Sequence, residues 1–150
     1  MNYSAAWACM LLGQLEEGQR LAHKAFVKAQ QHGVVGAQDW ANLVEAFLAI
    51  QAGRWDEAEK QGDSAYAIAT MLNDADMQAR VLWSRSVCDG WRDDWQCAIA
   101  NIKEAVEVAQ KDGETSMVFP HLLVQAAKSH LYAGKIAEAQ QSTQAGRRQG

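Results

Sequence analysis

Proline is almost absent from this chain of 150 residues, and the chain also lacks any β-strand pattern. Pro120 is the single proline, whereas alanine, the best helix former, supplies 27 residues. No long run alternates apolar with polar residues, as a half-buried strand would. The composition therefore favours an all-α fold, and the length favours one domain that spans residues 1–150.

Signals for membranes, secretion and nucleic acid are missing as well. No apolar run approaches the roughly 18 residues of a membrane span, and the first residues, MNYSAAWACMLLG, lack the charged region of a secretory signal. The net charge of −4 and the scattered Lys and Arg argue against a nucleic-acid partner. Cys9, Cys88 and Cys97 have no C-x-x-C spacing and are expected to be reduced thiols. Together these features predict a cytoplasmic protein.

Patterns that carry catalysis or bind metals are also absent. No G-x-G-x-x-G, Walker or G-x-S-x-G motif occurs. His121 and His130 are too far apart for metal ligands on one helix, which are spaced three or four residues apart, and the other two histidines repeat this separation. Acidic pairs such as Asp56-Glu57 lie at expected helix starts, where the helix dipole favours acids. We predict no enzyme activity, no metal and no cofactor.

What the chain does contain is a repeat of about 40 residues. Shifting the sequence by this period superimposes small, aromatic and turn residues together, and one last step of about 41 residues places Ala98 on Ala139. The superimposed sets are Gly13 with Gly53; Gly18 with Ala58 and Ala98; Ala25 with Ala65 and Ala105; Ala29 with Ala69 and Ala109; Gly33 with Asn73 and Gly113; and Leu15 with Trp55 and Trp95. The sequence therefore predicts about four repeats.

The superimposed residues have the roles expected in pairs of helices. Alanines four residues apart form one stripe of a helix and let neighbouring helices approach closely. Glycine and asparagine tolerate the left-handed backbone conformation that ends a helix. The turns between the two helices of a pair are expected at Gly13, Gly53, Asp93 and Gly134. The turns that follow the second helix of a pair are expected at Gly33, Asn73 and Gly113. Trp55 and Trp95 are expected to pack in the turns.

The repeat predicts eight helices. The first helices of the pairs are expected at 2–12, 37–52, 77–89 and 116–133, and the second helices at 15–32, 55–72, 94–112 and 136–147. Pro120 then lies in the first turn of its helix, where a missing N–H is tolerated. Short turns produce antiparallel pairs, and equal spacing stacks the pairs, so the predicted fold is an all-α solenoid of about four antiparallel helix pairs.

The turns between paired helices resemble those of tetratricopeptide repeats. AGRWDEA (52–58) and AGKIAEA (133–139) each join a glycine to a basic, an apolar and an acidic residue before alanine, whereas LGQLEEG and DDWQCA in the first and third repeats depart from this pattern. The period exceeds the roughly 34 residues of ordinary tetratricopeptide repeats. It is similar to the longer repeats in the sensor arrays of bacterial signalling ATPases, maltose-activator-like transcription regulators and nucleotide cyclases. The stretch FPHLLVQAAKSHLYAGKIAEAQQ looks most like those arrays, and the resemblance covers essentially the whole chain.

The resemblance implies a binding function rather than a catalytic one. Arrays of this kind bind peptides, proteins or small effectors, so we expect an interaction or scaffold module that holds a peptide or partner segment in its concave groove. The alternative is a small-effector-sensing part of a larger signalling regulator. A third hypothesis is that the chain is a piece of a longer array and self-associates through its terminal helices.

In the family that the chain resembles, the first helices of the pairs line the groove. The residues expected there are Tyr3, Trp7 and Leu11; Trp40, Leu43, Phe47 and Ile50; Arg80, Trp83, Val87 and Trp91; and His121, Val124, Lys128 and Tyr132. Trp, Tyr and Arg dominate binding hot spots, and Arg80 and Lys128 suit a carboxylate or phosphate. Alternatively, the aromatic residues fill the core between helices and the charged residues are solvated.

Overall fold

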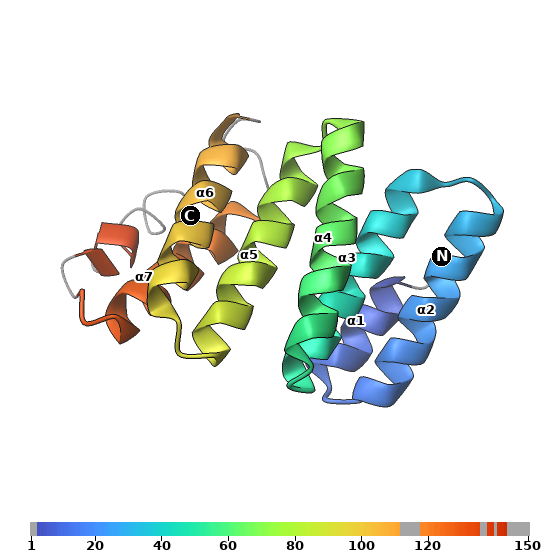
Figure 1. Cartoon of the computed structure of the whole chain (residues 1–150), viewed down its shortest axis with the longest axis horizontal. Helices are drawn as coiled ribbons and strands as arrows, with labels where there is room; N and C mark the ends of the chain where they lie inside the picture. Colours follow the sequence, from blue (N-terminus) through green and yellow to red (C-terminus); the bar gives the residue numbers. More distant parts are fainter. Residues whose placement is uncertain (1–2, 112–117, 136–137, 140, 144–150) are drawn as a thin grey trace. The chain divides into compact units, whose positions relative to one another are not determined.

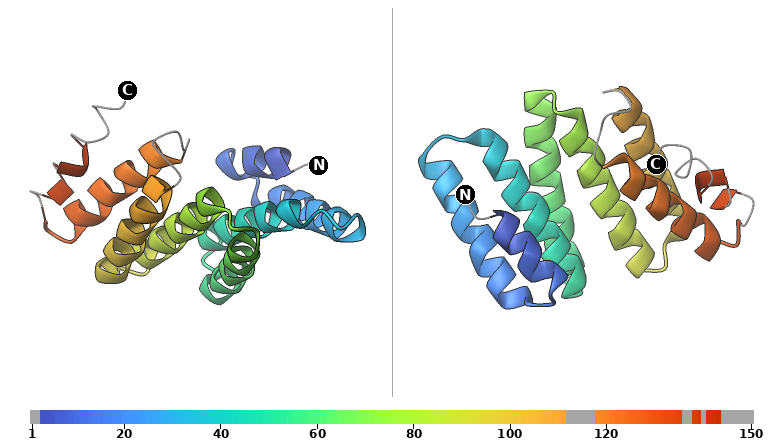
Figure 2. Two further views of the ribbon diagram at one scale, coloured as in Figure 1. Left: turned by 90° about the horizontal axis from the view of Figure 1, so that it is seen from above. Right: turned by 180° about the vertical axis from the view of Figure 1, so that it is seen from behind.

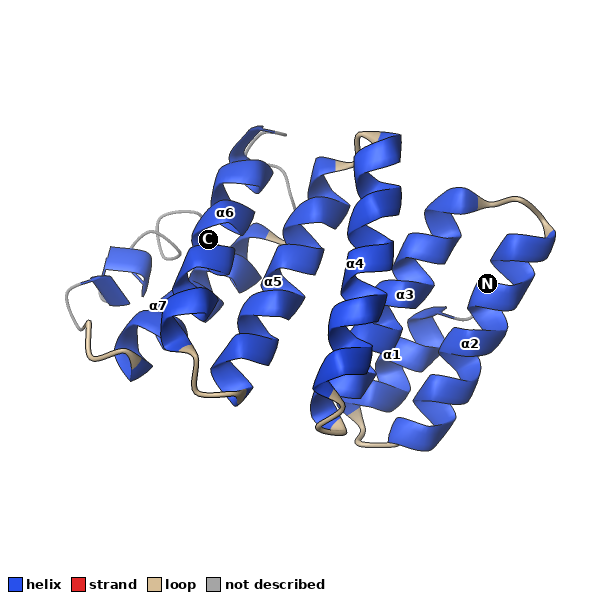
Figure 3. Ribbon diagram, viewed as in Figure 1, coloured by secondary structure: helices blue, strands red, loops and turns tan. Residues whose placement is uncertain are grey.

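The structure, a computed structural model, describes residues 3–111, 118–135, 138–139 and 141–143. These residues form helices joined by short turns, and they include no strand (Figures 1 and 3). The helices are α1 (Tyr3–Leu11), α2 (Leu15–Gln31), α3 (Val35–Gln51), α4 (Trp55–Leu72), α5 (Ala75–Trp91), α6 (Trp95–Lys111) and α7 (Phe119–Tyr132). Residues 138–139 and 141–143 are helical too. The predicted all-α class is confirmed.

The predicted helix bounds are close to the observed ones. Helices α1, α2, α4 and α6 differ from the prediction by at most one residue at each end, whereas α3 and α5 each begin two residues earlier. Helix α7 begins at Phe119, which places Pro120 in its first turn as predicted. Gly113 and most of the predicted helix 136–147 lie outside the described residues.

The helices belong to two compact units, residues 1–77 and residues 78–150. In the first unit, α1 packs on α2 and α3, α2 packs on α3, and α3 packs on α4. The right-hand view of Figure 2 shows α1 lying across α2 and α3. In the second unit, α6 packs on α7. There the Ser86 hydroxyl donates to the Ala98 carbonyl (2.8 Å) and the Asn101 amide donates to Asp89 (2.7 Å), which joins α5 to α6.

One backbone turn recurs between the paired helices. Its central residue has a positive φ at Gly13 (72°), Gly53 (71°), Asp93 (59°) and Gly134 (74°). The next residue donates its N–H to a carbonyl five residues back in each turn, from Gln14 to Cys9, Arg54 to Ala49, Asp94 to Asp89 and Lys135 to His130, over 2.7–2.9 Å. This bond closes the C-terminus of a helix. The predicted turns are confirmed, and an aspartate adopts the same conformation in the third.

The second helices of the first three pairs bury the same stripe, in which every residue except Ile102 is alanine or glycine. Each buries four residues at spacings of four, three and four: Gly18, Ala22, Ala25 and Ala29 in α2; Ala58, Gly62, Ala65 and Ala69 in α4; and Ala98, Ile102, Ala105 and Ala109 in α6. At Gly18, an added Cβ would lie 3.1 Å from the Leu48 side chain and 3.3 Å from the Ala6 carbonyl oxygen. The small residues therefore let α2 approach α1 and α3 closely.

Candidate binding surface

Helix α7 has one buried face and one exposed face. Its buried residues are Phe119, Leu122, Leu123, Gln125, Ala126 and Ser129. Five residues of the exposed face follow at helical spacing, and we refer to them together as the α7 surface: His121, Val124, Lys128, Leu131 and Tyr132. Three of them are large apolar or aromatic residues that are more than half exposed. Such residues are usually scattered singly, so their grouping on one helix face is a candidate for binding.

A buried polar network fixes which face of α7 points outward. The Gln125 amide donates to the hydroxyl groups of Ser86 on α5 and Ser129 on α7, each over 3.4 Å. Ser86 in turn donates to the Ala98 carbonyl on α6. Because a buried polar group without a partner is costly, rotating α7 would break the bond from Gln125 to Ser86 at a free-energy penalty. The network therefore helps to hold the α7 surface in the outward position.

Tryptophan rings hold both ends of the α7 surface. Trp83 of α5 stacks on His121, with ring centroids 5.5 Å apart and planes 13° apart. Trp95 of α6 stacks on Tyr132, with centroids 4.8 Å apart and planes again 13° apart. An added Cβ at Gly90 would lie 2.8 Å from the Trp95 ring, so the absence of a side chain at Gly90 leaves room for the ring. Side chains held in this way lose less conformational entropy when a partner binds.

The charge of α7 differs in sign from that of the whole chain. Residues 118–135 include Lys128, Lys135, His121 and His130 but no Asp or Glu, whereas the chain has a net charge of −4. Lys128 lies in the middle of the α7 surface, and its side chain is exposed. The surface therefore combines apolar side chains with a central cation.

The predicted groove residues of the first unit are mostly withdrawn from solvent. Leu43 and Phe47 were expected to be accessible, but both lie in the core because α1, α2 and α4 pack around α3. Trp7 of α1 contacts the Phe47 ring edge to face, with centroids 5.3 Å apart. Trp7 and Trp40 are half-buried. Phe47 therefore packs in the core, as the alternative for the aromatic residues had it, and Leu43 is a core residue as well.

The predicted residues of the second unit are more accessible. Arg80, Trp83 and Val87 are half-buried, while Trp91, His121, Lys128 and Tyr132 are exposed. The structure brings Trp83 and His121 together. The prediction omitted Leu131, although its spacing of three residues from Lys128 places it on the same helix face. It also assigned Trp95 to the turn alone, whereas the ring stacks on Tyr132 as well.

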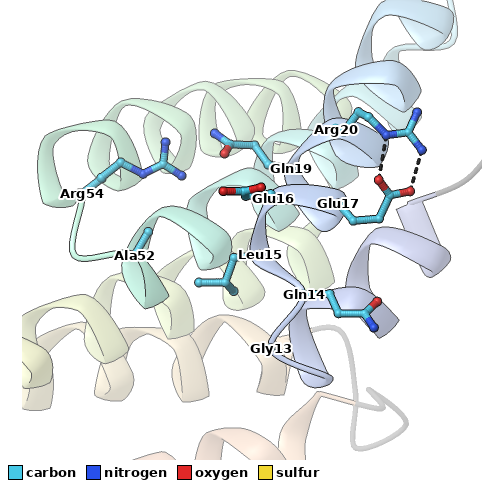
Figure 4. A pocket seen from close by; sticks show the side chains of 9 residues that line it. All are labelled: Gly13, Gln14, Leu15, Glu16, Glu17, Gln19, Arg20, Ala52 and Arg54. Atoms are coloured by element: carbon cyan, nitrogen blue, oxygen red, sulfur yellow. Dashed lines mark hydrogen bonds and ion pairs between the residues drawn. The ribbon is translucent and has the colours of Figure 1, made fainter.

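The first unit contains an open depression of about 840 Å³ that the sequence did not predict (Figure 4). It lies where the first turns of α2 meet the turn between α3 and α4, and Arg20 and Glu17 form a hydrogen-bonded ion pair in its lining. Its lining residues are Gly13, Gln14, Leu15, Glu16, Glu17, Gln19, Arg20, Ala52 and Arg54. Arg54 is held by Glu57, at 2.9 Å. The lining of the depression carries charges of both signs.

Asp39 is a buried acid in α3, with only 1% of its surface exposed. The Trp40 backbone N–H donates to its Oδ1 (2.6 Å), whereas its Oδ2 is buried without a hydrogen-bond partner. Burial raises the pKa of Asp39 to about 6, and the nearby charge of Asp74 adds to the rise. Because the carboxyl group is sealed from solvent, a substrate cannot reach it, and its effect is on stability.

The residues that the structure describes offer neither a metal site nor a helix that spans a membrane. Within these ranges, no three His, Cys, Asp or Glu side chains lie close enough together to hold a metal ion. None of the helices in the same ranges has the length and the apolar character needed to cross a bilayer.

Comparison with family models and with curated proteins gave no relative. No family model matches the sequence, and no curated protein matches it at a significant level. The case for any fold family or function therefore depends on the residues and the geometry of this chain.

Proposed function

We propose that this protein is a non-catalytic, cytoplasmic interaction module that binds a segment of another protein on the α7 surface. The observation that carries the proposal is the exposed face of α7, where Val124, Leu131 and Tyr132 stand beside Lys128 and two tryptophan rings hold the ends. Aromatic side chains that lose little conformational entropy when a partner binds are typical of binding hot spots.

The same proposal includes a tetratricopeptide-like solenoid. Two repeated features support it: the turn with a positive φ at four equivalent places, and the buried stripe of small residues in three equivalent helices. Repeated helix pairs with equal turns stack regularly, and solenoids of this kind use their surfaces to bind other chains. The free cysteines agree with a reducing compartment.

A selection from a random peptide library displayed on phage, with the full chain as bait, tests the function. We expect selected peptides to bind the wild type and to bind the double variant Val124→Glu, Leu131→Glu about tenfold or more weakly, because the variant removes the apolar contacts. Affinities would be measured by fluorescence anisotropy.

The matched control is the double variant Ala67→Glu, Ala100→Glu, which adds the same charge at exposed positions of α4 and α6. It should bind as the wild type does. Circular dichroism would check that both variants fold. A selection without enrichment, or selected peptides that bind all three proteins equally, would refute the proposed function.

The depression in the first unit supports a second candidate function, which is the sensing of a small anionic effector. Its lining offers Arg20 and Arg54, which pair with Glu17 and Glu57 in the absence of an effector, together with the amides of Gln14 and Gln19. A carboxylate or phosphate compound at 100 times its Kd should stabilise the wild type by about 2.7 kcal/mol, and Arg54→Ala should reduce this gain. A screen of such compounds by thermal unfolding measures it. An equal shift in Tm for the wild type and the variant would exclude the depression as the site.

A further inference from the structure

Residues on the α7 surface occupy repeat positions that are core positions in α3. Gly53 and Gly134 mark the same place in their turns, so Val124, Lys128 and Leu131 are equivalent to Leu43, Phe47 and Ile50. Leu43 and Ile50 are 1% and 3% exposed, whereas Val124 and Leu131 are 69% and 57% exposed. A set of positions that is covered in α3 is therefore open in α7.

The packing around α3 shows which kind of segment suits these positions. Helices α1, α2 and α4 pack against α3, and short turns join them. Side chains three and four residues apart form ridges that fit the grooves of a neighbouring helix. Val124, Lys128 and Leu131 have this spacing and are exposed, so the middle of the α7 surface fits a helix.

Charge determines which helix would fit. Lys128 stands where α3 has Phe47, and residues 118–135 carry no acid to neutralise it. An occupant with an acidic side chain opposite Lys128 and apolar side chains opposite Val124 and Leu131 would therefore complement the surface. A second copy that paired its own α7 symmetrically would bring like charges together, which is unfavourable.

We propose that the occupant of the α7 surface is an amphipathic helix of a partner protein that carries an acidic residue between apolar ones. This inference rests on the proposed function and adds the secondary structure and the charge of the partner. His121 and Tyr132, each stacked on a tryptophan, bound the docking site at its two ends.

Designed peptides test the inference on the full chain. The probes are fluorescein-labelled amphipathic helical peptides with leucines three and four residues apart and with Glu, Gln or Lys at the central position. In anisotropy titrations we expect the Glu peptide to bind the wild type about tenfold more tightly than the Lys peptide, with the Gln peptide between them.

The variant Lys128→Glu should reverse the order of the peptides. Lys128 is exposed, so we expect the variant to fold, and its urea midpoint would show this. The matched control is Lys60→Glu on α4, which makes the same change in net charge at another exposed position and should leave the order unchanged.

The possible failures are distinguishable. If the Glu and Lys peptides bind the wild type equally, an acidic partner is excluded. If the double variant Val124→Glu, Leu131→Glu then binds neither peptide, the proposed function still stands. If no designed peptide binds but phage-selected peptides do, the helical partner is excluded and the function again stands. If sedimentation shows a dimer that the same double variant dissociates, the occupant is a second copy and the inference is overturned.

Discussion

Replacing Asp39 with asparagine is expected to stabilise the protein at pH 7 by up to about 3 kcal/mol. The pKa of Asp39 rises from 3.8 to about 6 on folding, and each unit of such a shift corresponds to about 1.4 kcal/mol. Asparagine keeps an oxygen that can accept the Trp40 N–H and carries no charge to bury. The substitution removes the penalty for burying an ionised carboxyl group. The new NH2 group is buried where Oδ2 has no partner, and it offsets part of the gain, by about 1–3 kcal/mol.

The pH dependence follows from the sign of this shift. A raised folded pKa means that the folded protein holds its proton more tightly, so the contribution of Asp39 to stability is fully present below about pH 4. It is lost as the pH rises towards about 6 and above, where the buried carboxyl group ionises. The asparagine side chain does not titrate, so the difference between variant and wild type should grow across this window.

Urea unfolding followed by circular dichroism between pH 4 and pH 8 measures this difference. The matched control is Asp56→Asn, because Asp56 is exposed in the first turn of α4. There the helix dipole favours an acid, so the control should be neutral or slightly destabilising at pH 7. An Asp39→Asn variant that is less stable than the wild type at pH 7, or a difference that does not change with pH, would contradict the account of Asp39.

The variant Ala65→Leu is expected to lower the free energy of unfolding by about 1–3 kcal/mol. Ala65 has no exposed surface and lies in the middle of the stripe that α4 turns toward the core of the first unit. A leucine there needs space for three more carbon atoms, which the backbone of the neighbouring helix would have to provide. Thermal and urea unfolding would measure the loss.

Ala67→Leu is the matched control, since Ala67 lies two residues away on the exposed side of α4. Both substitutions have the same effect on helix propensity, because alanine and leucine are both strong helix formers. The control should therefore remain within about 0.5 kcal/mol of the wild type. Equal losses in the two variants would mean that the buried stripe has no special role in packing.

The sequence predicted the turns and helices of this chain well, because both depend on local chemistry. Gly13, Gly53 and Gly134 have the positive φ that only glycine adopts freely, and the repeat places Asp93 with them. The first residues of some helices were harder to predict. Helix α3 begins at Val35, before Gly36, because its first turn accepts a glycine that the sequence pattern assigns to the preceding loop.

The residues of the proposed binding surface were predicted only in part, because periodicity shows which residues share a helix face and not what covers that face. Leu43 and Lys128 belong to equally regular stripes, yet one is core and the other is exposed. The stacking of Trp95 on Tyr132 joins two residues far apart in sequence, so local spacing does not indicate it. Asp39 is one of the two acids in a largely apolar helix, which is only a weak indication that this carboxyl group is buried.

The stripes of small residues also affect how stability varies with temperature. Alanine and glycine at the helix contacts remove little apolar surface from water, compared with the leucines and isoleucines of most cores. The heat capacity of unfolding increases with the apolar surface exposed, and it is typically about 12–15 cal/mol/K per residue. The stripes contribute less to this heat capacity than leucines at the same contacts would, so we expect a broader and shallower stability curve than leucine-rich contacts would give.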